Sequence, residues 1–94
     1  MYGLASNGQE ALDLIKNSKK YPDVILMDHR MPIMTGIEAS IEILKIEKKI
    51  RIIIISADNS IKEKAIEIGA SFFLDKPFTI EHLIRTINNV LSFP

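Results

Sequence analysis

Cysteine is absent from this 94-residue chain, and so is an excess of charge of either sign. Without cysteine, disulfide scaffolds, thiolate zinc sites and thiol nucleophiles are excluded. Lys and Arg together number 12, Asp and Glu also number 12, and the formal net charge is zero. A chain with this balance has no strong field to attract DNA, RNA or anionic lipid, so we expect no direct nucleic-acid or membrane binding.

Long hydrophobic runs are also missing. The longest, residues 52–55, is far shorter than the roughly 20 residues of a membrane-spanning helix. The first residues lack the charged segment and apolar stretch of a secretory signal. Because 47% of the residues are hydrophobic, the chain can still bury a core. We therefore expect residues 1–94 to form one slightly short domain in the cytoplasm.

Short apolar runs alternate with helical patterns along the chain. Residues 23–28, 50–56 and 71–75 predict strands, and residues 2–6 predict a weaker first strand. The runs are continuous rather than alternating, which is typical of a parallel sheet covered on both faces. The predicted order β-α-β-α-β-α-β-α implies right-handed crossovers and a doubly wound α/β fold with four strands and four helices.

The helices are predicted from apolar spacing and from their ends. Thr35 and Glu38 have capping-box spacing, Ser60 and Glu63 repeat it, and Gly69 is a natural residue to follow a helix. The expected inward stripes are Leu12, Leu14 and Ile15 in residues 9–19; Ile37, Ile41 and Leu44 after Thr35; and Leu83, Ile84, Ile87 and Leu91 in residues 79–91.

Chemistry in such a sheet is expected beyond the carboxyl ends of its strands. The second predicted strand ends in Asp28, the third in Ser56, and Lys76 and Pro77 follow the fourth. A carboxylate can attack phosphorus to form an acyl phosphate. A hydroxyl, an ammonium and a metal ion would each stabilise the charge on the transferred phosphoryl group.

These residues also carry a resemblance that extends over essentially the whole chain. Residues 22–38 (PDVILMDHRMPIMTGIE), Ser56-Ala57, Lys76-Pro77-Phe78 and residues 7–12 (NGQEAL) resemble the signature segments of response-regulator receiver domains. The resemblance implies a CheY-like, flavodoxin-like fold in a two-component phosphorelay. It also implies a histidine kinase as phosphoryl donor and a protein as output partner, whose identity stays open.

The resemblance assigns a role to each of these residues. Asp28 would be the phosphoacceptor, Ser56 would bind a phosphoryl oxygen, and Lys76 would pair with the phosphoryl group before a cis peptide bond to Pro77. Phe73 falls at the aromatic switch position, and Ser56 would share in the switch. Mg²⁺ would be held by Asp28 and by the backbone carbonyl of Arg30.

One feature of the family has no counterpart. Receiver domains begin with a strand that ends in two adjacent acidic residues, followed by a helix, whereas this chain starts at the match to the second strand. Mg²⁺ affinity should then be weak, because Mg²⁺ usually takes one or two carboxylates. In the strand order 2-1-3-4-5 the missing strand is central. Exposing ~600 Å² of apolar surface there would cost ~15 kcal/mol, as much as a domain's whole stability of ~5–15 kcal/mol.

Two remedies are open: the sheet closes with a different strand neighbour, or another chain fills the gap. We expect a homodimer with Leu83, Ile84, Ile87 and Leu91 in or near the contact.

Other functions remain open beside a phosphoacceptor. The chain could be a receiver-derived module, no longer phosphorylated, that acts by dimerisation or partner binding. An aspartyl-phosphate hydrolase of the haloacid dehalogenase type would need a second Asp at the position of Arg30, and flavin binding lacks a hydroxyl-rich phosphate loop. Taken singly, Asp28 is a common turn residue, Phe73 a common core residue, and His29 a poor metal candidate without a second histidine nearby.

Overall fold

The computed structural model describes residues 2–4, 8–17, 19–28 and 35–92, the first three by their backbone alone. Strands and helices alternate along the described residues as the sequence predicts. The strands are β1 (Tyr2–Leu4), β2 (Val24–Asp28), β3 (Arg51–Ser56) and β4 (Phe72–Asp75). The helices are α1 (Gly8–Asn17), α2 (Gly36–Ile46), α3 (Lys62–Glu67) and α4 (Ile80–Ser92), and a 3-10 turn, η1 (Asn59–Ile61), precedes α3.

The four strands form one parallel sheet in the order β1-β2-β3-β4. β1 pairs directly with β2, with Tyr2 opposite Val24 and Leu4 opposite Leu26. The sheet has therefore closed where the family pattern predicts a further central strand. Of the two expected remedies, the structure uses a new strand neighbour within the same chain.

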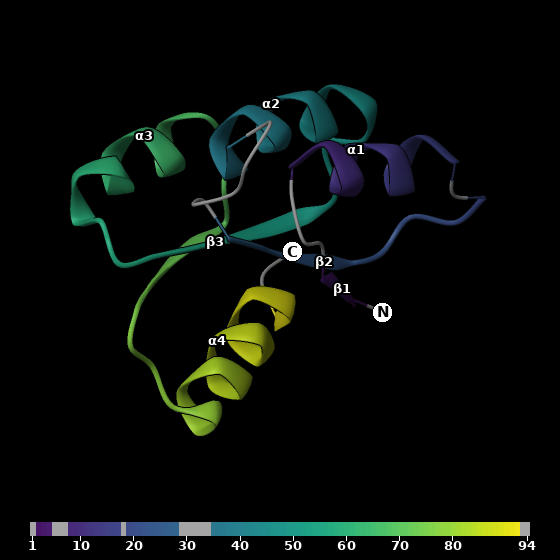
Figure 1. The fold of residues 1–94 in the computed structure, drawn as a ribbon. Helices are drawn as coiled ribbons and strands as arrows, with labels where there is room; N and C mark the ends of the chain where they lie inside the picture. Colours follow the sequence, from purple (N-terminus) through teal and green to yellow (C-terminus); the bar gives the residue numbers. More distant parts are fainter. Residues whose placement is uncertain (1, 5–7, 18, 29–34, 93–94) are drawn as a thin grey trace.

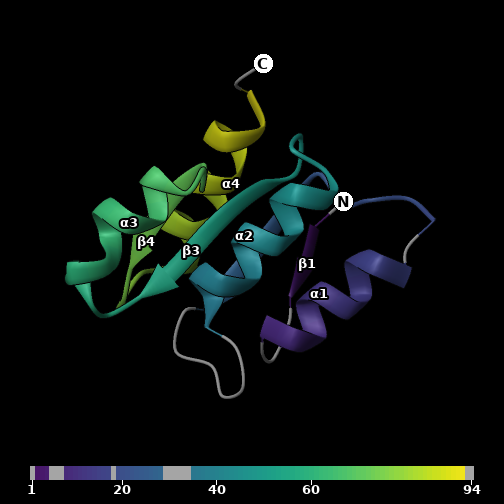
Figure 2. The same ribbon diagram turned by 90° about the horizontal axis from the view of Figure 1, so that it is seen from above.

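The two faces of this sheet are covered unequally. Of the helices that the structure describes, α1, α2 and α3 lie side by side on one face and α4 lies by itself on the other (Figures 1 and 2). The fold is thus doubly wound, as predicted. The larger core, under the three helices, includes Ile25, Met27, Ile52, Ile54 and Phe73 from the strands. The smaller core, under α4, consists of Val24, Leu26, Ile53, Ile55, Leu74 and Val90.

The inward stripes of three helices differ from the prediction. In α2, Ile37 and Ile43 are buried, whereas Ile41 and Leu44 pack only partly against the larger core. In α1, Ala11, Leu12 and Ile15 are buried, whereas Leu14 is exposed. In α4, Thr86 and Val90 are the buried residues and Leu83 and Ile87 pack partly against the smaller core. Ile84 and Leu91 are exposed instead. The apolar residues of α4 form two adjacent stripes, one with Leu83 and Ile87 and one with Ile84 and Leu91. The orientation of the helix on the sheet determines which stripe is packed.

The helix ends confirm one predicted cap and correct another. At α2 the Thr35 hydroxyl accepts from the Glu38 N–H and the Glu38 carboxylate accepts from the Thr35 N–H, a complete capping box. Ser60 does not cap α3. It lies within η1, where the Asp58 carboxylate accepts from both its N–H and its hydroxyl.

Gly69 ends α3 as predicted. Its φ of +110° is in the region that favours glycine. The Gly69 N–H donates to the Ile66 carbonyl and the Ala70 N–H to the Ala65 carbonyl, both at 3.1 Å, which is the Schellman pattern. No helix among the described residues is both long and apolar enough to cross a membrane.

Candidate functional site

Three of the predicted site residues lie at the carboxyl edge of the sheet. Asp28 is the last residue of β2, Ser56 is the last residue of β3, and Lys76 directly follows β4. Because the strands are parallel, their carboxyl ends meet at one edge. Asp28 pairs with Ile55 and Ser56 pairs with Asp75, so the register places the three residues in neighbouring strands.

Asp28 and Lys76 are in direct contact. The Lys76 Nζ donates to Asp28 Oδ2 at 2.7 Å, although the two residues are 48 positions apart in the sequence. Their side chains are 36% and 40% exposed, respectively. The pair is therefore both ordered by the fold and accessible from solvent, so a phosphoryl donor could reach the carboxylate beside a fixed positive charge.

Ser56 is fully buried and bonded within its own loop. Its hydroxyl oxygen accepts from the Asp58 N–H at 3.0 Å, and its carbonyl accepts from the Lys76 N–H at 3.0 Å. The second bond connects the end of β3 to the start of the segment that carries Lys76. The structure thus brings Asp28 and Lys76 together, while the Ser56 hydroxyl is held by a backbone group.

Asp58 is the site residue that the sequence analysis did not single out. Its backbone binds Ser56, and its carboxylate caps η1. The signal was present in the sequence, because an Asp two residues before a Ser is a common start for a turn or helix.

Two further predictions concern the segment around Lys76. The peptide bond between Lys76 and Pro77 is cis, as predicted. Phe73 is buried in the larger core, on the face covered by α1, α2 and α3. Its burial agrees with the simpler interpretation as a core residue, and its role as a switch stays a prediction.

The described carboxylates do not form a cluster that could hold Mg²⁺. Every Asp and Glu of the chain is among the described residues, and within them no group of three or more His, Cys, Asp or Glu residues is close enough to hold a metal ion. Arg30, whose carbonyl was a predicted ligand, and His29 lie outside the described residues. One carboxylate that already binds Lys76 is a poor donor set for an ion that prefers octahedral oxygen ligands.

Comparison with known proteins decides the family. The sequence model of the response regulator receiver domain matches residues 1–88. The chain belongs to the response-regulator receiver domain family. It is 40% identical over 90 residues to the chemotaxis protein CheY of Thermotoga maritima, covering 94% of this chain and 73% of that protein.

Solved receiver structures share the fold. The receiver domain of NtrX from Brucella abortus matches with a TM-score of 0.84 at 26% identity, over 96% of this chain and 77% of that one. The receiver domain of the sensor histidine kinase PA1611 from Pseudomonas aeruginosa matches with a TM-score of 0.83 at 27% identity, over 97% and 76%. That structure has a magnesium ion coordinated in the active-site cleft. Receiver domains are two-component signalling modules that interact with histidine kinases.

Proposed function

We propose that Asp28 accepts a phosphoryl group from a histidine kinase and that the phosphorylated receiver acts on a downstream protein. The observation that carries this proposal is the 2.7 Å contact between Asp28 and Lys76 at the carboxyl edge of the sheet. It places an accessible nucleophile beside a cation that would bind the phosphoryl oxygens.

The chemistry is an in-line displacement at phosphorus. With acetyl phosphate as the donor, an Asp28 oxygen forms the new bond to phosphorus, the bond between phosphorus and the acetyl oxygen breaks, and acetate leaves with the electron pair. With a phosphohistidine donor, the bond that breaks joins phosphorus to the imidazole nitrogen. In both cases Lys76 would stabilise the charge on the equatorial oxygens.

Ser56 and Phe73 would convert phosphorylation into a change of surface. The Ser56 hydroxyl, bonded to the Asp58 N–H, would exchange that partner for a phosphoryl oxygen. Phe73 would respond from the adjacent strand β4, and the face formed by β3, β4 and α4 would change. The arrangements before and after this change would differ in the contacts of Ser56 and Phe73, and phosphorylation would favour the second of them.

The test is intact-mass spectrometry after incubation with acetyl phosphate. We expect one phosphoryl group to be added to the native chain and none to Asp28→Asn. Asp75→Asn is the matched control, because Asp75 is an exposed carboxylate at the end of β4, which β3 separates from Asp28's strand. Labelling of Asp28→Asn at the native level would show that another residue is the acceptor.

A second function, dimerisation, is favoured by the outer stripe of α4. Ile80, Ile84 and Leu91 are exposed along this helix. Within the described residues, α4 is the single helix on its face of the sheet (Figure 1). Burial of this stripe by a second copy would remove apolar surface from water. We propose that the chain forms a homodimer through this stripe, with Leu83 and Ile87 beneath it contacting the smaller core.

Sedimentation velocity tests the dimer with a matched pair of variants. Ile84 of α4 and Leu14 of α1 are 53% and 55% exposed, and the two helices lie on opposite faces of the sheet (Figure 1). We expect Ile84→Glu to shift the protein to monomer and Leu14→Glu to leave the dimer intact. A monomer for the native chain at micromolar concentration would contradict the homodimer.

A further inference from the structure

A groove lies between the second half of α2 and the end of α3. Its volume is about 410 Å³, and it is lined by Ile41, Leu44, Lys45, Lys48, Ile68 and Gly69. Because α2 ends shortly before β3 and α3 ends shortly before β4, the groove lies at the amino edge of the sheet, away from the edge that carries Asp28. We infer that this α2–α3 groove binds a peptide segment of a partner protein in which an aliphatic or aromatic side chain is flanked by carboxylates.

The floor of the α2–α3 groove is apolar and is held by the core. Ile41 and Leu44 of α2, and Ile68 at the end of α3, are partly buried and packed against the larger core. A floor built from such side chains keeps its shape without a ligand, which lowers the ordering cost of binding. The volume is within the range of ligand pockets, roughly 300–1,000 Å³, so a large apolar side chain can enter.

The packing of α2 leaves this floor uncovered. On one side α2 packs against α1, whereas on the other side the groove separates it from the end of α3 (Figure 2). Gly69 lies at this end, and a Cβ built there would lie 3.1 Å from Leu44 Cδ1. A side chain at position 69 would therefore cover part of the floor, and glycine leaves Leu44 open to a ligand.

Lys45 and Lys48 form a basic rim on the α2 side of the groove, and both are exposed. The Lys45 Nζ is 3.4 Å from Glu42 Oε1, with the two side chains 67% and 46% exposed. An exposed pair of this kind contributes little, so Lys45 can exchange it for a carboxylate of a ligand. The Glu47 carboxylate accepts from the Lys49 N–H at 3.0 Å and so binds the backbone that leads to β3. Charge complementarity therefore favours an acidic partner.

A peptide fits these features better than a nucleic acid does. A nucleic acid is held mainly through many phosphate contacts by a broad array of cations, whereas two lysines beside an aliphatic floor suit one apolar side chain with carboxylates next to it. The partner segment is recognised by this pattern, independently of whether Asp28 is phosphorylated.

The experiment selects ligands from a displayed library of random peptides, with the unphosphorylated chain as target, and measures the affinity of the selected peptides by calorimetry. We expect them to share an aliphatic or aromatic residue flanked by Asp or Glu. Lys45→Glu and Lys48→Glu should each weaken binding about tenfold, because attraction becomes repulsion. Lys16→Glu is the matched control, since Lys16 is an exposed lysine in the last turn of α1, and its affinity should stay within about twofold of native.

A second readout locates the bound peptide. The amide resonances of Leu44, Lys45 and Gly69 should shift on titration, and Ala in place of the apolar residue of the peptide should abolish the shifts. Failure to enrich any peptide, enrichment of peptides without acidic residues, or largest shifts on α4 would overturn the inference.

Sedimentation and the acceptor variant separate the remaining outcomes. A native dimer that Lys48→Glu breaks and Ile84→Glu does not would show that a second copy occupies the groove, and would overturn the assignment to a peptide. Asp28→Asn should bind the selected peptides as the native chain does, so a failure of phosphoryl transfer to Asp28 would leave this inference standing.

Discussion

The two faces of the sheet are made by the same strands but packed by different numbers of helices. The face under α1, α2 and α3 holds the larger core, and the face under α4 holds the smaller one. Within β3, Ile54 belongs to the first core and Ile53 to the second, and both are fully buried. β3 therefore contributes side chains to both cores. The loss of stability caused by a cavity in each core can be compared by substitutions within this one strand.

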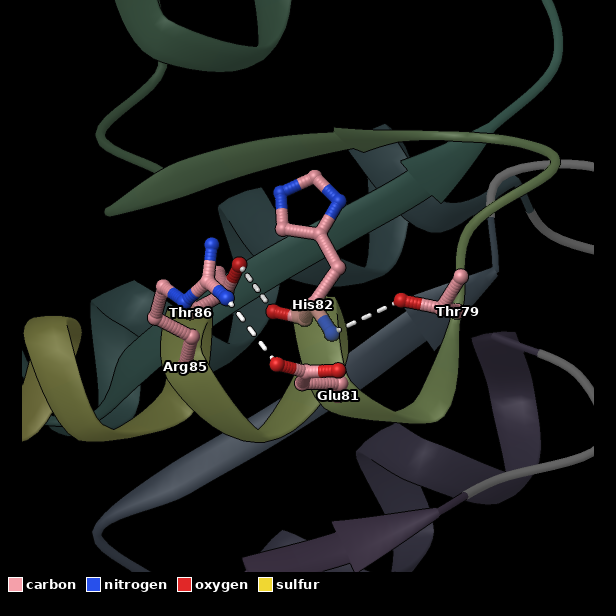
Figure 3. A network of polar contacts seen from close by, with 5 residues as sticks. All are labelled: Thr79, Glu81, His82, Arg85 and Thr86. Atoms are coloured by element: carbon pink, nitrogen blue, oxygen red, sulfur yellow. Dashed lines mark hydrogen bonds and ion pairs between the residues drawn. The ribbon is translucent and has the colours of Figure 1, made fainter.

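The difference also shows in how each helix is held. α2 contacts α1 and the strands beneath it, and it begins with a reciprocal capping box. α4 has contacts with β4 but no helix beside it in the described part of the chain. Its polar contacts are largely its own: Thr79 accepts from the His82 N–H, the Thr86 hydroxyl donates to the His82 carbonyl, and Arg85 pairs with Glu81 (Figure 3).

The largest effect is expected from cavities in β3. Ile54→Ala should lower the free energy of unfolding by ~4 kcal/mol and Ile53→Ala by ~2.5 kcal/mol. The same atoms are removed in both variants, but α4 has no described helix beside it and can move toward the cavity more easily than the helices on the opposite face. Urea denaturation measures both, with unchanged m-values as the sign of two-state unfolding. Equal losses would mean that the two faces are equally rigid.

The next effect concerns the turn that closes the three-helix face. Gly69→Ala should cost ~1–2 kcal/mol, because φ is positive there. In addition, the new Cβ would lie 3.1 Å from Leu44 Cδ1 of α2. Thermal unfolding measures the loss. Ser71→Ala, at an exposed neighbour, is the control and should stay within ~0.5 kcal/mol. A neutral Gly69→Ala would show that the turn adapts without strain.

The smallest effects are expected at the helix caps. Thr35→Ala should cost ~1 kcal/mol of global stability, and Thr79→Ala about half of that. Loss of the Thr35 hydroxyl breaks a capping box in a helix that packs against α1 and the sheet, whereas α4 can fray at its first turn while the rest stays folded. Hydrogen exchange checks this. Thr79→Ala should speed exchange only at the start of α4, and uniform acceleration would show that α4 unfolds with the whole domain. Thr35→Ser, which keeps the hydroxyl, should restore most of the loss.

The element order, the parallel sheet and most strand ends could be predicted from the sequence, because continuous apolar runs and capping residues are local signals. The predicted strand 71–75 is observed as Phe72–Asp75, and the predicted helix 79–91 as Ile80–Ser92. The stripes of α1 and α4 could not be predicted fully. Leu14, Ile84 and Leu91 are apolar and at helical spacing, yet exposed, because the docking angle of a helix depends on its neighbours.

The sequence was sufficient to predict that the site residues lie at one edge of the sheet. Asp28, Ser56 and Lys76 each stand at the end of a predicted strand, and parallel strands have their carboxyl ends at the same edge. The resemblance added the cis bond before Pro77, which is present. The partner of Ser56 could not be predicted, because the bond to the Asp58 N–H depends on how the loop after β3 turns. The contact between Asp28 and Lys76 joins strands that are not neighbours, which no local pattern encodes.

The sequence by itself determined which segments are strands and helices, where α2 begins and α3 ends, and which side chains stand at the ends of strands. These follow from apolar periodicity, hydroxyl and carboxylate caps, and the backbone freedom of glycine, all of which act over a few residues. Only the tertiary structure decided that β1 pairs directly with β2, that α4 lies on the face opposite the other described helices, and that Lys76 Nζ contacts Asp28 Oδ2. Those outcomes depend on which apolar surfaces, distant in the sequence, pack together and exclude water. This packing is a property of the whole chain.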